Sequence, residues 1–246
     1  MLSVDINCDM GEGIGNDEQL MPFISSASIA CGYHAGDEKT MQQTVDLCIK
    51  NKVTIGAHPS FFDRENFGRN EMNLSADEVY RIVIEQINDL LNITKEKGAT
   101  LHHVKPHGAL YNMASKDASL AAAIAKAVKD IDSSLILYGL ANSCSITEAK
   151  KIGLKTASEV FADRTYQENG SLTSRKLPGA MIENADESIK QVLQMIKHKT
   201  VYAISGKEIS IHAETVCIHG DGRHAVEFAK NIHEKFKTED IVIKAI

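Results

Sequence analysis

The sequence predicts a single α/β barrel with about seven parallel strands, and three observations lead to this fold. Short apolar runs alternate with amphipathic helical stretches along the 246 residues, and repeated units of this kind form a parallel sheet covered by helices. No composition break, low-complexity segment or short repeat divides the chain, so one domain over residues 1–246 is expected. Charged and histidine residues follow strand after strand, which is typical of barrels whose strand ends form a site.

The elements follow from these patterns in chain order. Strands are predicted at residues 2–7, 28–31, 53–58, 100–105, 135–140, 154–161, 201–204 and 215–220. Helices are predicted at residues 37–52, 75–98, 118–131, 143–152, 186–198 and 222–236. The longest helix begins at Ser75, which has capping-box spacing to Glu78, and it ends at Gly98. Residues 163–178 are expected to form a long functional loop.

Charge and cysteine content exclude several classes of protein. The net charge is -6, with 27 basic and 33 acidic residues, which argues against binding to nucleic acid or to an anionic membrane. No stretch approaches the roughly 20 apolar residues that span a bilayer, and the start lacks a signal-peptide pattern. The 5 cysteines are an odd number without a C-x-x-C pair, which suits free thiols in a reducing cytoplasm. A cytoplasmic protein is therefore expected.

Chemically active residues follow the predicted strands in six segments. These segments read NCDMGE (7–12), CGYHAGD (31–37), GAHPSFFDRENFGR (56–69), VKPHGALYN (104–112), EVFADRTY (159–166) and CIHGDGRH (217–224). Each residue alone has a structural alternative, since His58 can be a satisfied loop histidine and Asp37 can cap the following helix. Because all six segments end on one face of a parallel barrel, they favour an active site there.

A metal site is possible but no compact ligand motif requires one. His103 and His107 are four residues apart, but Pro106 between them disfavours the helix that would place both on one face. A ligand set such as Asp9, His34 and His58 or His107 is possible from the fold. A divalent metal therefore stays an open alternative.

Nucleophilic catalysis and nucleotide binding have little support in the sequence. No G-x-S-x-G motif occurs, and no cysteine has the flanks of a known nucleophile. The SGKE stretch at Ser205 lacks the upstream glycine of a P-loop, and GEGIGN near Gly11 is not a dinucleotide-binding motif. If ATP is used, the chain has no recognisable site for it.

Together the motifs resemble the LamB/YcsF family, which comprises the A subunits of ATP-hydrolysing 5-oxoprolinase. The resemblance rests on DINCDMGEG, ACGYHAGD, GAHPSFFDRENFGR, VKPHGALYN, EVFADRTY, RKLPGA and CIHGDG, from residue 5 to about residue 224. It implies a distorted β/α barrel similar to the glycoside hydrolase/deacetylase superfamily. It also implies ATP-dependent opening of 5-oxo-L-proline (pyroglutamate) to L-glutamate together with partner subunits B and C. The missing P-loop fits an arrangement in which those partners bind the ATP.

Opening a lactam needs a general base, an acid for the departing nitrogen and donors at the developing oxyanion. In our hypothesis Asp9, His34 or His58 activates water and His107 protonates the nitrogen. Lys105 contacts the carbonyl, a phosphate or the substrate carboxylate, or is instead a structural cation paired with Asp5 or Asp9.

The remaining candidates are substrate-binding residues. Arg69 and Arg164 have the planar fork that suits a carboxylate, and Asn7 and Glu12 would orient the catalytic groups. The substrate-binding set is completed by Asp37, Tyr111 and His219.

Two other functions compete with this interpretation. One is a stand-alone metal-dependent deacetylase or amidohydrolase, which would lose activity to a chelator and need no ATP. The other is a non-catalytic binding subunit whose partners do all the chemistry, in which changes at Asp9, His34 or Lys105 would weaken binding only.

Overall fold

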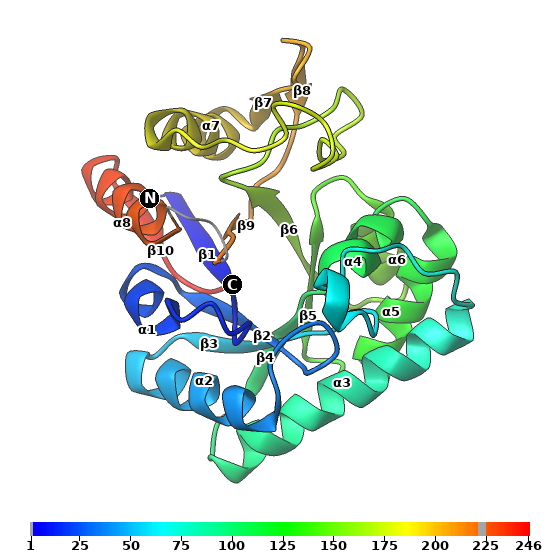
Figure 1. Cartoon of the computed structure of the whole chain (residues 1–246). Coiled ribbons are helices and arrows are strands. Elements are labelled where there is room, and N and C mark those ends of the chain that lie inside the picture. Colours follow the sequence, from blue (N-terminus) through cyan, green and yellow to red (C-terminus); the bar gives the residue numbers. More distant parts are fainter. Residues whose placement is uncertain (1, 221–224) are drawn as a thin grey trace.

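The chain forms a closed barrel of parallel strands surrounded by helices (Figure 1). The computed structural model describes residues 2–220 and 225–246. Within them the barrel runs in the order β1-β2-β3-β4-β5-β6-β9 and closes by pairing β9 with β1. Its strands are β1 (Leu2–Met10), β2 (Ser26–Ala30), β3 (Thr54–His58), β4 (Leu101–Val104), β5 (Ile136–Leu140), β6 (Lys155–Phe161) and β9 (Thr215–Ile218). The predicted seven-stranded parallel barrel is confirmed.

Strand β1 pairs with three other strands. Its second half pairs with β2, from Asn7 opposite Ser26, and its middle pairs with β9, from Asp5 opposite Thr215. Its first residues pair with β10 (Ile241–Ile243), which the sequence pattern did not predict. The register also shifts between β3 and β4. The extra pairing with β10 and this register shift make the barrel irregular.

Alternation along β1 gives the barrel a polar interior. Ile6, Cys8 and Met10 point to one side of the strand and are buried in the apolar core. Asp5, Asn7 and Asp9 alternate with them and contact residues across the barrel, including Tyr138 on β5 and Glu159 on β6. The polar strand ends are therefore continuous with polar positions inside the barrel.

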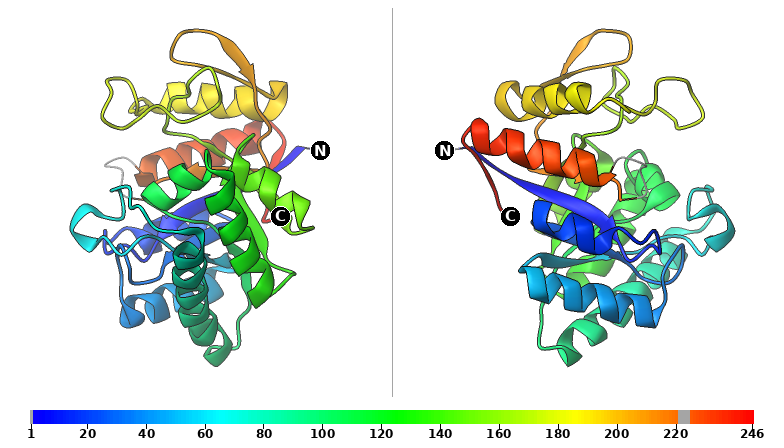
Figure 2. Two further views of the ribbon diagram at one scale, coloured as in Figure 1. Left: turned by 90° about the vertical axis from the view of Figure 1, so that its right-hand side faces the viewer. Right: turned by 60° about the vertical axis from the view of Figure 1, so that its left-hand side comes forward.

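The helices cover the outside of the strands (Figure 2). The longest, α3 (Ala76–Glu96), begins with the predicted capping box between Ser75 and Glu78 and buries Val79, Val83, Ile87 and Leu90. It packs against α2 (Glu38–Asn51) and α5 (Ala118–Ile131). The others are α1 (Asp17–Leu20), α4 (Gly108–Ala114), α6 (Cys144–Lys151), α7 (Ala185–His198) and α8 (Ala225–Thr238), with short 3₁₀ turns η1 (Met21–Phe23) and η2 (Arg64–Asn66). The predicted start of the last helix at residue 222 lies outside the described residues.

One predicted strand does not join the barrel. The apolar run near residue 201 forms β7 (Thr200–Tyr202), which pairs antiparallel with β8 (Glu208–Ser210). This hairpin stands beside α7 at one side of the barrel (Figures 1 and 2). Alternation alone predicts a strand but not which partner it pairs with.

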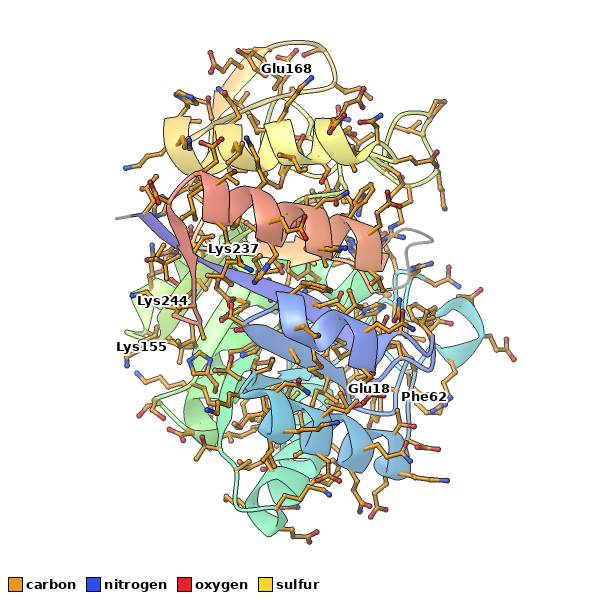
Figure 3. The ribbon with its side chains drawn as sticks, turned by 90° about the vertical axis from the view of Figure 1, so that its left-hand side faces the viewer. Glu18, Phe62, Lys155, Glu168, Lys237 and Lys244 are labelled. Carbon is orange, nitrogen blue, oxygen red and sulfur yellow. The ribbon has the colours of Figure 1, made fainter. Side chains whose placement is uncertain are left out.

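The two ends of the barrel are easily located in Figure 3. Lys155, which begins β6, and Lys244 lie at one end, and Phe62, in the loop after β3, lies at the other. The long loops that follow the strands therefore gather at the Phe62 end. No helix in residues 2–220 and 225–246 has the length and apolar character needed to cross a bilayer.

Candidate active site

A cavity of about 560 Å³ lies at the carboxyl ends of the barrel strands. Such a volume suits a small-molecule ligand. The cavity brings together segments that are far apart in the sequence, from the ends of β1, β3, β4, β6 and β9. The predicted residues that line it are Asp9, Glu12, His58, Arg69, Lys105, His107, Tyr111, Arg164 and His219.

Lys105 lies on the floor of this cavity and is almost completely buried. Its Nζ is 2.5 Å from Asp9 Oδ1 and 3.0 Å from Glu159 Oε1, and it donates to Asn7 Oδ1 at 2.8 Å and to Cys217 Sγ at 3.3 Å. Burial alone would lower the pKa of Lys105, but its acidic neighbours outweigh burial and hold that pKa well above its usual value. Lys105 therefore stays protonated.

Asp9 pairs with Lys105 and lines the cavity. Burial raises the pKa of Asp9, but His58 and Lys105 together outweigh burial, so the net pKa lies well below the usual value. The carboxylate therefore stays ionised. Lys105 does pair with Asp9, as one alternative predicted, and not with Asp5, whose oxygens accept from Ser25, Ser26 and Thr215.

Three buried histidines form a cluster beside Asp9. His58 Nε2 lies 3.4 Å from Asp9 Oδ1 and 2.9 Å from His107 Nδ1. The rings of His34 and His107 stack with centroids 3.8 Å apart. Gly68 fits over this stack with a φ of +64°, and a Cβ there would lie 2.9 Å from His34 Cβ. A side chain at position 68 would therefore displace the cluster.

The rim of the cavity carries guanidinium and imidazole groups. Arg164 Nη2 donates to the carbonyl of Thr173 at 2.6 Å, while its buried Nε has no hydrogen-bond partner in the part of the chain that the structure describes. That N–H can donate to a ligand carboxylate. His219 Nδ1 lies 2.9 Å from both carboxylate oxygens of Asp163, and its ring stacks on Phe161.

Three predicted residues do not line the cavity. Asn7 lies beneath it and holds Lys105 and Glu159 in place, because its amide accepts from the first and donates to the second at 2.9 Å. His34 lies behind His107, on which its ring stacks. Asp37 is exposed and caps α2, accepting from the backbone N–H of Thr40 at 2.8 Å. Its position supports the capping alternative, not substrate contact.

A model of the LamB/YcsF family matches residues 4–246. This chain belongs to the LamB/YcsF family. The match confirms the resemblance that the strand-end motifs predicted. These family motifs supply the cavity floor, the histidine cluster and the rim described above.

Comparison with individual relatives extends the match over whole chains. The A subunit of 5-oxoprolinase from Tolumonas auensis is 51% identical over 251 residues and covers 100% of both chains. The lactam utilization protein of Thermus thermophilus has a TM-score of 0.93 at 39% identity, over 100% of both chains. The peptidoglycan deacetylase PdaC of Bacillus subtilis has a TM-score of 0.51 at 12% identity, over 100% of this chain and 88% of that one, which shows a shared barrel fold.

The site contains further residues that the strand-end motifs did not single out. Glu159 contacts Lys105 and Asn7, and Cys217 accepts from Lys105. Burial raises the pKa of Cys217 well above its usual value despite the nearby lysine, so it remains a thiol rather than a nucleophile. Glu159 is the single acid of β6 and directly precedes the apolar Val160 and Phe161. That position was the signal for it, because a buried carboxylate requires a partner.

The histidine cluster makes stability depend on pH. Burial is the larger cause and the neighbouring His58 the smaller one, and together they lower the pKa of His34 from 6.5 to about 2. Since the folded pKa lies below the unfolded one, the unfolded chain takes up a proton below pH 6.5 and the folded chain does not. The stability present above that pH is therefore lost as pH falls, by about 2 kcal/mol between pH 7 and pH 5 for His34 alone. The lowered pKa values of His103 and His107 act in the same direction.

Urea unfolding at pH 7 and pH 5, with a chelator present, measures this loss. His34→Gln removes one titrating group, so its free energy of unfolding is expected to change less between the two pH values. Equal stability of the wild type at both pH values would contradict the prediction.

Proposed function

We propose that this chain is the lactam-opening subunit of an ATP-dependent 5-oxoprolinase, acting with partner subunits B and C to convert 5-oxo-L-proline to L-glutamate. One observation carries the proposal: an ionised carboxylate, Asp9, is held between a buried lysine and a histidine at the floor of a small cavity. The half-identical relative from Tolumonas auensis, named as a subunit of 5-oxoprolinase, supports the choice of substrate.

The reaction needs activation because a γ-lactam is a resonance-stabilised, nearly unstrained amide. Transfer of a phosphoryl group from ATP to the carbonyl oxygen makes the carbonyl carbon electrophilic. Water then adds to that carbon, the C–N bond breaks, and the nitrogen takes a proton. A second water releases phosphate from the acyl phosphate, so one lactam, one ATP and two waters give glutamate, ADP and phosphate.

Asp9 and Lys105 fit the water-addition step. Asp9 is ionised, as a group that takes a proton from water must be. The ammonium 2.5 Å from Asp9 offsets the negative charge of the phosphate on the substrate oxygen. The free N–H of Arg164 at the rim would bind the substrate carboxylate.

The proton for the departing nitrogen is better supplied by His219 than by His107. His107 Nε2 donates to the carbonyl of Phe67 at 2.9 Å, and its Nδ1 faces His58. Burial, together with His34 and His58, also lowers the pKa of His107 well below its usual value. His219 lines the cavity and has an acidic partner, Asp163, that orients its ring.

Partner subunits would handle the nucleotide. The residues that came near a P-loop pattern, Ser205–Lys207, lie in the turn between β7 and β8 and do not line the cavity.

Glutamate release from 5-oxo-L-proline tests the proposal. The purified chain is assayed alone and with subunits B and C, each with and without ATP. Turnover is expected only in the mixture that contains both partners and ATP. Turnover by the chain alone, without ATP and abolished by a chelator, would support the stand-alone amidohydrolase instead.

A further inference from the structure

Backbone carbonyls around the histidine cluster determine which ring nitrogens carry hydrogen. His58 Nδ1 lies 2.6 Å from the carbonyl oxygen of Lys105, and His107 Nε2 lies 2.9 Å from that of Phe67. A carbonyl oxygen only accepts, so both of these nitrogens are N–H donors. The opposite nitrogens, His58 Nε2 and His107 Nδ1, therefore present lone pairs when the rings are neutral.

His34 is oriented in the same way by a serine. The hydroxyl of Ser60 donates to the carbonyl of Phe61 at 2.8 Å. It therefore accepts from His34 Nδ1, which lies 3.0 Å away. His34 Nε2 is left with a lone pair, 3.3 Å from Glu12 Oε1.

Four atoms that can donate an electron pair thus lie close together. Glu12 Oε1 also lies 3.5 Å from His107 Nδ1, and one ligand atom from each of Glu12, His34, His58 and His107 lies within 4.8 Å of the others. His58 Nε2 and His107 Nδ1 face each other at 2.9 Å. A single proton between these two accounts for their short contact but does not join them to His34 or Glu12. One divalent cation satisfies all four donors.

We propose that Glu12, His34, His58 and His107 bind one divalent first-row transition-metal ion. Three imidazoles and a carboxylate are donors that Zn²⁺ takes in tetrahedral sites, and the ligating histidines of such sites usually donate their other N–H to a protein oxygen, as these three do. Glu12 takes the place that the sequence analysis gave to Asp9, because Asp9 already forms the ion pair with Lys105. Two nitrogens on one Zn²⁺ are about 3.4 Å apart, so His58 and His107 separate slightly on binding.

Binding is measured without reference to turnover, so its failure is distinct from failure of the proposed function. The full chain is stripped with a chelator, the chelator is removed, and Zn²⁺ is titrated in by calorimetry. One Zn²⁺ per chain is expected. His34→Ala and Glu12→Gln should each weaken binding by about a hundredfold or more, since even loss of a group that only hydrogen-bonds a ligand costs about 10–100-fold. Ser60→Ala removes the acceptor of His34 Nδ1 and should weaken Zn²⁺ binding by about 10–100-fold.

Control variants separate this site from its surroundings. His212→Ala lies on the surface, with a side chain that is 57% exposed, and should leave affinity unchanged. A second possible donor group combines Asp9, Cys217 and His219. Loss of binding in His219→Ala with full binding in His34→Ala would place the ion there and overturn the proposal. Absence of Zn²⁺ binding in the wild type, with folding verified by circular dichroism, would also overturn it.

Discussion

Replacement of Asp9 by asparagine is expected to lower glutamate release by the complete three-subunit system by about 10²–10⁴-fold, the range that a general base contributes. Asparagine keeps the size of the side chain but cannot accept a proton from water. It also removes the negative charge that lies 2.5 Å from Lys105 Nζ. The measurement is the rate of glutamate release at saturating 5-oxo-L-proline with ATP and both partners.

Asp37→Asn is the matched control for this experiment. Asp37 follows a neighbouring strand, but it caps α2 and does not line the cavity. Asparagine is an equally good cap, so turnover and stability should stay close to those of the wild type. Turnover of Asp9→Asn within about tenfold of wild type would show that another group activates water.

Replacement of Lys105 by methionine is expected to lower the free energy of unfolding by about 3–5 kcal/mol, the cost of removing one partner from a buried ion pair. Methionine fills most of the volume of the lysine but leaves Asp9 and Glu159 buried without their cation. Asn7 also loses the donor to its side-chain oxygen. Urea unfolding at pH 7 measures the effect.

Two further variants test whether the loss comes from charge. Adding Glu159→Gln to Lys105→Met removes one uncompensated carboxylate, so the double variant should be more stable than the sum of its single changes predicts. Lys126→Met breaks a solvent-exposed pair with Asp130 and should leave the unfolding midpoint nearly unchanged. A small effect of Lys105→Met would mean that the lysine contributes only to chemistry.

The local sequence determined most of the elements and the position of the site. The capping box at Ser75 and the helical period after it predicted α3, because capping and amphipathic burial depend on residues a few positions apart. The polar residues after successive apolar runs predicted that Asp9, His58 and Lys105 would meet, since parallel strands share a carboxyl end. Short elements such as α1 and β10 were missed because so few residues carry little periodic signal.

Only the tertiary structure decided which of these residues are partners. Lys105 binds Asp9 and Glu159, which are separated from it by 96 and 54 positions in the sequence, and strand register sets such pairs. The same holds for Glu12, which belongs with the histidines, and for Asp37, which turns away to cap a helix. The ring tautomers depend on carbonyl groups of other segments. Local pattern determines what each segment forms, whereas barrel closure brings distant side chains within the few ångströms at which charge and hydrogen bonding act.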